Sequence, residues 1–306
     1  MNINQLKYVL EVAASSSMRE AATKLFVTQP ALSASIHELE EELEIQIFRR
    51  TNKGISLTDA GREFVDYAKK TVGQYAVLED RYLSPDRDRK RFSVSTQHYN
   101  FAIRSFARVI RKYDPERFLF CIHETKTREV LERVRDMKSE VGIVSYSGAN
   151  EAVLRKLLKE YQLEFVPLMV RDTYAYFWKD HPCAGRETIS LKELQEYPCV
   201  AFDQSDDSHF YLTEEAMADR DFEKLIRSDD CATTMELIAE LNGYSIGSGM
   251  LSEEDAILQG LVSVKLEEED PLIIGYITRL GAELSEYGMT YVEELQKFKE
   301  LGKEKD

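Results

Sequence analysis

The residues with the clearest binding chemistry lie between positions 29 and 53. Gln29 and Ser33 carry amide and hydroxyl groups, which suit the mixed donor and acceptor pattern that base pairs display in the major groove of DNA. Arg49, Arg50 and Lys53 form a basic cluster shortly after them. Guanidinium and ammonium groups bind phosphates and supply salt-dependent affinity while reading little sequence. This region therefore indicates a nucleic-acid partner.

A second polar stretch consists of Ser95, Thr96, Gln97, His98 and Tyr99. It directly follows a predicted strand and opens a predicted helix, and the hydroxyls and free backbone N–H groups of such a position favour an anionic or carboxylate-bearing ligand. Alternatively, one of the two hydroxyls only caps the helix, and the two roles are compatible. Candidates at equivalent strand ends are Thr125, Ser145, Phe202 and Gly247.

Neither region predicts catalysis or a metal site. No G-x-S-x-G turn surrounds Ser95, and no acid can be assigned to orient His98 as its base. The five histidines lack the H-x-x-x-H and H-E-x-x-H spacings of metal ligands. The four cysteines form no C-x-x-C pair, which favours reduced, buried thiols. We therefore expect a protein that is not an enzyme and has no metal and no cofactor.

The elements that must position these residues begin with three predicted helices. Apolar spacing predicts helices over 4–14 and 18–25, the second opened by a capping box of Ser17 and Glu20,. A third begins after Thr28 as N-cap, and Leu32, Ile36, Leu39 and Leu43 form its buried stripe,. On the opposite or flanking face are Pro30, Ser33, Ala34 and His37, with Gln29 at the N-terminal tip.

Residues 45–50 and 55–57 then predict a β-hairpin that carries the basic cluster on its turn,. Two short helices, a longer helix with a polar N-terminal face, and this wing together match a winged helix-turn-helix. The run of five glutamates between Glu38 and Glu44 lies at the far end of the third helix, where we expect a solvated face.

Residues 1–61 resemble the winged helix of LysR-type transcriptional regulators, above all in AATKLFVTQPALSASIHELEEELEIQIFRRTNKGISLTDAG. The resemblance implies that Gln29, Pro30, Ser33 and Ala34 face the groove and that Arg50 with Lys53 grips the DNA backbone. Ala34 stands where family members usually carry a long basic residue.

The following segment predicts one long dimerising helix. Apolar residues alternate four and three apart from Phe64 to Tyr82, which forms a heptad seam that a second copy could cover. We expect a homodimer through residues 58–83, and two winged helices related by a two-fold axis would read an inverted repeat. The alternative is that the seam packs against its own domain. Ser84 and Pro85 end the helix and begin a hinge,.

Beyond residue 91, predicted strands, among them 141–146, 199–202 and 244–247, alternate with helices of ten to fifteen residues, which indicates α/β units with largely parallel sheets. The layout resembles the effector domain of the same family, in which two subdomains akin to periplasmic binding proteins enclose a ligand cleft. The predicted divisions are a DNA-binding domain (1–58), a linker helix and hinge (59–90) and an effector domain (91–306). Subdomain I takes in about 91–164 and 266–306, and subdomain II about 165–265.

Composition sets the outer limits on function. The 306 residues, 43 % of them apolar, suffice for two or three folded units,, and no apolar run approaches the ~20 residues of a membrane span. The N-terminus lacks a secretory signal, so we expect a cytoplasmic protein with no membrane partner. Residues 1–91 hold 14 basic and 14 acidic side chains, so the net charge of −15 belongs to the remainder. A neutral N-terminal unit can still present a local basic surface to phosphate.

The first hypothesis is thus a transcriptional regulator that binds promoter DNA, forms dimers that pair into tetramers as in the family, and responds to an anionic or amino-acid-related effector. In an alternative, a solute-binding or enzymatic α/β protein uses its N-terminal helices only for assembly and does not bind duplex DNA. In a third, an architectural DNA-binding protein has no effector. Neither activation nor repression follows from the residues.

Overall fold

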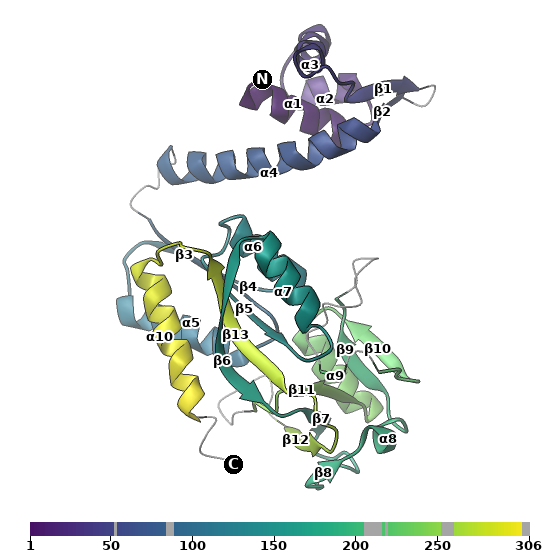
Figure 1. Cartoon of the computed structure of the whole chain (residues 1–306), viewed down its shortest axis with the longest axis vertical. Coiled ribbons are helices and arrows are strands. Elements are labelled where there is room, and N and C mark those ends of the chain that lie inside the picture. Colours follow the sequence, from purple (N-terminus) through teal and green to yellow (C-terminus); the bar gives the residue numbers. More distant parts are fainter. Residues whose placement is uncertain (52–53, 84–88, 205–215, 218–219, 252–259, 302–306) are drawn as a thin grey trace. The chain divides into compact units, whose positions relative to one another are not determined.

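The computed structural model describes residues 1–51, 54–83, 89–204, 216–217, 220–251 and 260–301. The chain divides into two compact units, Met1–Arg87 and Asp88–Asp306. Figure 1 shows both units, with colour running along the chain from purple to yellow. Each unit has buried apolar clusters of its own. None of the described helices is long and apolar enough to cross a membrane.

The first unit contains the three predicted helices, α1 (Ile3–Ala14), α2 (Met18–Lys24) and α3 (Gln29–Leu43). Thr28 caps α3 through a bond that its Oγ1 accepts from the Ala31 N–H at 3.4 Å. Pro30 lies in the first turn, where its missing N–H leaves no bond unmade. The buried residues of α3 are Leu32, Ile36 and Leu39. Ala21 and Ala22 are buried on α2, and their small side chains allow the helices to approach closely.

The capping box predicted for α2 is only half formed. Ser17 Oγ accepts from the Glu20 N–H at 3.2 Å as expected. The Glu20 carboxylate instead accepts from the N–H and the hydroxyl of Ser16, at 2.9 and 2.5 Å. These bonds, with the ion pair to Lys24, lower the pKa of Glu20 to about 2. Ser16 supplies both its N–H and its hydroxyl, so the carboxylate turns one residue further back than a capping box requires.

The predicted wing is present as β1 (Phe48–Thr51) and β2 (Gly54–Leu57), which pair antiparallel with Arg50 opposite Ile55. The strand begins three residues later than predicted because Glu40 ties down the preceding loop. Its carboxylate accepts from the N–H groups of Ile47 and Phe48, at 2.7 and 3.0 Å. One glutamate of the acidic run therefore has a structural role rather than a purely solvated one.

Helix α4 (Asp59–Tyr82) follows the wing, with Thr58 Oγ1 accepting from the Gly61 N–H at 2.8 Å. Part of its predicted seam is covered within the unit, because Ala68 is buried and Phe64 packs on the core of the unit. Lys7 of α1 lies over the Tyr75 ring at 5.0 Å. The apolar residues that stay exposed on the helix are Tyr67, Leu78 and Tyr82.

The first sheet of the second unit has five strands in the order β4-β3-β5-β13-β6. Its strands are β3 (Lys90–Thr96), β4 (Phe118–Glu124), β5 (Val141–Tyr146), β6 (Leu163–Arg171) and β13 (Leu272–Arg279). Its helices are α5 (Asn100–Tyr113), α6 (Thr127–Arg135), α7 (Glu151–Glu160) and α10 (Glu286–Leu301). Figure 1 shows α10, in yellow, beside α5, although some two hundred residues separate them in sequence.

The second sheet has six strands in the order β10-β9-β11-β7-β12-β8. Its strands are β7 (Tyr174–Trp178), β8 (Thr188–Ile189), β9 (Cys199–Phe202), β10 (Leu225–Ser228), β11 (Tyr244–Gly247) and β12 (Leu261–Leu266), and its helices are α8 (Leu191–Leu194) and α9 (Cys231–Leu241).

Both sheets are mixed rather than largely parallel. Parallel pairs include those of β3 with β4 and with β5. The strands that begin or end a crossing between the sheets, such as β6, β7 and β13, pair antiparallel. The chain crosses from one sheet to the other between residues 171 and 174 and returns between 266 and 272. The first crossing lies about seven residues beyond the predicted limit at 164, because β6 pairs with β13 along its whole length.

Candidate functional site

The face of α3 opposite its buried stripe carries the residues predicted to read DNA. Gln29, Pro30, Ala34 and His37 are exposed there, and Ser33 is half-buried. His37 Nε2 lies 3.2 Å from the Glu41 carboxylate one turn further along. The N-terminal part of the helix therefore offers an amide, a hydroxyl and small side chains on one accessible surface. Groups of these types suit base edges.

The wing carries the first residue of the basic cluster, Arg49, on an exposed position of β1. Its Nε donates to Ser56 Oγ on β2 at 3.2 Å, which orients the side chain and leaves other guanidinium N–H groups for an acceptor. The backbone of Arg50 forms part of β1, but the Arg50 side chain is not among those that the structure describes. Lys53 lies outside the described residues altogether.

The polar stretch, whose first two residues are the last two of β3, is built differently from the prediction. Helix α5 begins at Asn100 with Tyr99 as its N-cap, so neither Ser95 nor Thr96 caps it. Both hydroxyls are fully buried and bonded within their own sheet and its helices. Ser95 Oγ lies 2.7 Å from Ser139 Oγ and accepts from Arg133 Nε at 3.1 Å, while Thr96 Oγ1 donates to the Gln97 carbonyl at 2.7 Å. These groups hold the strand end in place.

Gln97 joins three elements through one buried amide. Its Oε1 accepts from the N–H and the hydroxyl of Ser145 at the end of β5, at 2.6 and 3.1 Å. Its Nε2 donates to Thr127 Oγ1 at the start of α6, at 2.5 Å. The structure thus brings together two of the predicted effector residues, Gln97 and Ser145, as a structural link. Nearby, Thr125 Oγ1 donates to the Glu129 carboxylate at 2.6 Å.

The next two predicted residues, His98 and Phe202, lie where the ends of the two sheets meet. The His98 ring stacks on the Phe202 ring with centroids 3.5 Å apart and an interplanar angle of 4°. His98 Nε2 is 3.7 Å from the Glu124 carboxylate. This stack unites two predicted residues from different sheets at the strand ends, where ligands bind in open α/β folds.

Four residues that the sequence interpretation missed extend the same contact. The Thr127 N–H, the first of α6, donates to Gln204 Oε1 at 3.0 Å, and Lys126 Nζ lies 3.4 Å from the Asp203 carboxylate. Gln204 is buried, and its Nε2 has no hydrogen-bond partner among the described residues. These residues follow β4 and β9 by one to three positions, so the strand-end rule that selected Thr125 and Phe202 could have found them.

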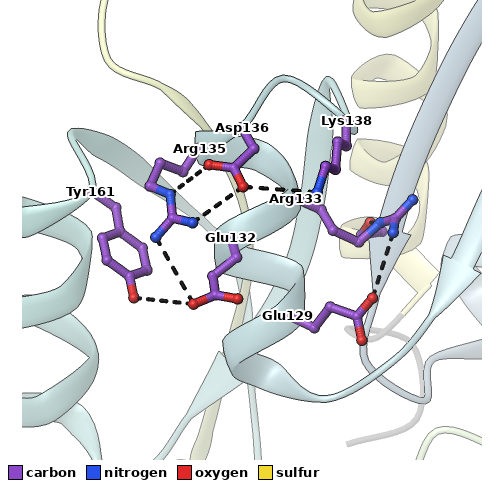
Figure 2. A network of polar contacts seen from close by, with 8 residues as sticks. Glu129, Glu132, Arg133, Arg135, Asp136, Lys138 and Tyr161 are labelled. Carbon is purple, nitrogen blue, oxygen red and sulfur yellow. Dashed lines mark hydrogen bonds and ion pairs between the residues drawn. The ribbon is translucent and has the colours of Figure 1, made fainter. Parts of the chain in front are cut away.

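A network of charged side chains fixes the helix that supplies this N–H group. Figure 2 shows Arg135 between Asp136 and Tyr161. Its guanidinium donates to both oxygens of Asp136, at 2.7 and 3.2 Å, and lies 4.4 Å over the Tyr161 ring. Hydrogen bonding to Asp136 raises the pKa of Arg135. Separately, Glu129 and Arg133 pair at 3.5 Å one turn earlier, and Arg133 Nε donates to Ser95 Oγ.

The remaining predicted strand-end residue, Gly247, has a packing role. A β-carbon there would lie 2.5 Å from the Tyr176 ring, so the close approach of that ring requires glycine. Among the described residues, no group of three or more His, Cys, Asp or Glu side chains is arranged to hold a metal ion. None of the four cysteines, all of which lie among the described residues, forms a disulfide, and Cys183 and Cys199 are buried.

Known proteins resemble the chain along almost its whole length. Residues 3–62 match the model of the bacterial regulatory helix-turn-helix protein, lysR family, and residues 119–298 match that of the LysR substrate binding domain. The DNA-binding transcriptional dual regulator OxyR of Escherichia coli K12 is 23 % identical over 293 residues, which cover 93 % of this chain and 91 % of OxyR.

Among solved structures, the LysR family regulator CbnR has a TM-score of 0.58 at 17 % identity, covering 97 % of this chain and 99 % of CbnR. Full-length CbnR complexed with its target DNA has a TM-score of 0.60, with the same identity and coverage. These likenesses show a shared fold.

Proposed function

This chain belongs to the LysR family of regulators, and we propose that α3 and the wing bind promoter DNA while the contact between the two sheets binds an anionic or amino-acid-related effector. The family is one of DNA-binding transcriptional regulators with an effector-binding domain, and such regulators are not enzymes. The proposal assigns particular residues of this chain to these general functions. We also propose that two copies of the chain associate through α4 and that the dimers pair into tetramers.

The DNA interface rests on the exposed face of α3. Gln29, Pro30 and Ala34 are accessible while Leu32 and Ile36 anchor the same helix in the core. A helix held in this way can enter the major groove with its N-terminal residues foremost. Arg49, exposed on the adjacent wing, supplies a cation for the phosphates that border the groove.

Two substitutions are expected to separate base reading from phosphate binding. Gln29→Ala should reduce the preference for the cognate site by about 10- to 100-fold, as a lost base contact does, and should leave the salt dependence unchanged. Arg49→Ala should weaken binding to all duplexes and reduce the slope of log K against log salt by about 1. Fluorescence anisotropy with cognate and scrambled duplexes measures both. Lys156→Ala, an exposed cation of the second unit, is the control. Unchanged affinity and specificity in both variants would refute these roles.

The effector proposal rests on one observation, which is that Gln204 Nε2 has no hydrogen-bond partner among the described residues. A buried amide donor is normally hydrogen-bonded, and leaving it unpaired is costly. The oxygen of the same amide, Oε1, accepts from the first N–H of α6, and a helix N-terminus favours negative charge. A ligand that carries a carboxylate would satisfy the donor and benefit from that field.

Peroxide is the competing signal, because a relative from Dickeya chrysanthemi, 22 % identical over 293 residues, carries the name hydrogen peroxide-inducible genes activator. A disulfide needs Cα atoms within about 7 Å. Cys199, the first residue of β9, lies opposite Leu225, the first residue of β10. Cys231 comes three positions after Ser228, the last residue of β10. Three residues of strand span about 10 Å, so the backbone positions of these two cysteines disfavour a disulfide between them.

The variant Gln204→Glu tests the effector proposal because it keeps the acceptor for the Thr127 N–H and replaces only the donor. We expect a carboxylate among a panel of dicarboxylates, α-keto acids and amino acids to raise the thermal midpoint of the wild type. Gln204→Glu should bind that carboxylate at least tenfold more weakly, since it exchanges a hydrogen bond for like-charge repulsion. Calorimetric titration measures the difference. Equal affinity, or DNA binding altered by hydrogen peroxide and by no carboxylate, would contradict the proposal.

A further inference from the structure

Phe26 has the most exposed large apolar side chain in the described part of the chain. Its exposed fraction is 95 %, whereas that of Phe118, the other exposed phenylalanine, is 38 %. Phe26 lies in the turn between α2 and α3, and a short turn of this kind could be built with a polar residue. Burial of its ring therefore plays no part in the stability of this unit.

The backbone of the turn also disfavours this residue type. Phe26 has φ of 56° and follows the C-cap of α2. Its N–H bonds the Thr23 carbonyl at 3.2 Å, and the Val27 N–H bonds the Ala22 carbonyl at 3.0 Å. This pair of bonds is the Schellman motif, whose left-handed position normally carries glycine or asparagine because a β-carbon is unfavourable there. Such strain, held without any gain in packing, often marks a functional residue.

The position of the ring favours one partner. Phe26 precedes the N-cap Thr28 by two residues, and Thr28, Gln29 and Pro30 are all exposed. The turn and the tip of α3 therefore form one continuous accessible edge. In a helix-turn-helix this edge approaches the rim of the major groove, where deoxyribose carbons and thymine methyl groups offer apolar contact.

We propose that Phe26 is a DNA-contacting residue whose ring packs on deoxyribose and thymine methyl groups at the rim of the major groove. The proposal rests on the function proposed above, that α3 binds duplex DNA. It adds an apolar contact to the amide, hydroxyl and phosphate contacts of α3 and the wing. Because the contact carries no charge, it contributes affinity without salt dependence.

The test replaces Phe26 by residues that the turn itself prefers. Phe26→Gly and Phe26→Asn should keep or raise the thermal midpoint of the chain, because they relieve the left-handed position. Both should weaken binding of the cognate duplex by roughly tenfold, since partial burial of a phenylalanine ring contributes on that order. The slope of log K against log salt should not change. Phe26→Leu, which keeps an apolar side chain, should recover part of the affinity.

The control is Met137→Gly, which alters another exposed residue with positive φ, in the second unit. It should change the midpoint in the same direction and leave DNA binding unaltered. Wild-type affinity in Phe26→Gly and Phe26→Asn would overturn the proposal, as would an affinity loss accompanied by a fallen midpoint, which would assign Phe26 to folding. If the wild type itself binds no duplex, the proposed function fails first, so the two failures are distinct.

Discussion

Gly61→Ala is expected to destabilise the N-terminal unit enough to abolish DNA binding. A β-carbon at this position would lie 2.0 Å from the Ile47 carbonyl oxygen and 2.9 Å from its carbon. Both are backbone atoms, so no side chain can move to relieve the clash. Because Ile47 is itself held by Glu40 and by the Thr58 N–H, the wing and the first turn of α4 must separate. We expect a loss of about 3 kcal/mol or more, the upper range for overpacking.

A second glycine of the same helix provides the matched control. A β-carbon at Gly73 would meet no other element of the described chain within 4 Å, and alanine is favoured over glycine in a helix interior by about 0.8–1 kcal/mol. Calorimetry of the full chain should therefore show the first unit melting earlier in Gly61→Ala and no earlier in Gly73→Ala. Wild-type melting and DNA binding in Gly61→Ala would contradict the packing described for this junction.

Gln97→Leu is expected to destabilise the second unit by about 2–5 kcal/mol. The substitution removes all three side-chain hydrogen bonds of a residue that is fully buried. It removes the oxygen that accepts from the Ser145 N–H and hydroxyl and the amide that donates to Thr127, and each buried hydrogen bond lost in this way costs about 1–3 kcal/mol. Because Gln97 holds the start of α6, the variant should also lose any stabilisation by the effector.

The exposed glutamine Gln195 supplies the comparison for this substitution. Gln195→Leu changes the same side chain where it is accessible, and surface changes usually stay within about 0.5 kcal/mol. Chemical unfolding of the two variants, followed by circular dichroism, measures the difference. If Gln97→Leu proved as stable as Gln195→Leu, the assignment of Gln97 as a structural link would be wrong.

Local signals in the sequence were sufficient for the elements with strong periodicity and clear ends. Thr28 and Pro30 fixed the start of α3, and Thr58 fixed that of α4, because a cap depends only on residues within one turn. The bounds of β5, β9 and β11 were predicted to the residue, since short apolar runs there end at polar residues or glycine. The resemblance to LysR regulators supplied the order of the larger parts.

Features that depend on distant partners were beyond the same reasoning. Ser95 and Thr96 were predicted to face a ligand, but their partners are Ser139, Arg133 and the Gln97 carbonyl. Nothing in the local pattern distinguishes a hydroxyl that meets a ligand from one that meets another element. Similarly, the end of β6 could not be placed, because its pairing partner β13 lies a hundred residues further along the chain.

The most direct test is the binding of the full chain to duplex DNA from the region upstream of its own gene, titrated against salt. We expect saturable binding whose log K falls linearly with log salt, with a slope of about 0.9 per phosphate neutralised, and a preference over scrambled duplex of about a thousandfold or more. Binding without sequence preference, or no salt-dependent binding at any duplex concentration, would contradict the assignment of α3 and the wing to promoter DNA.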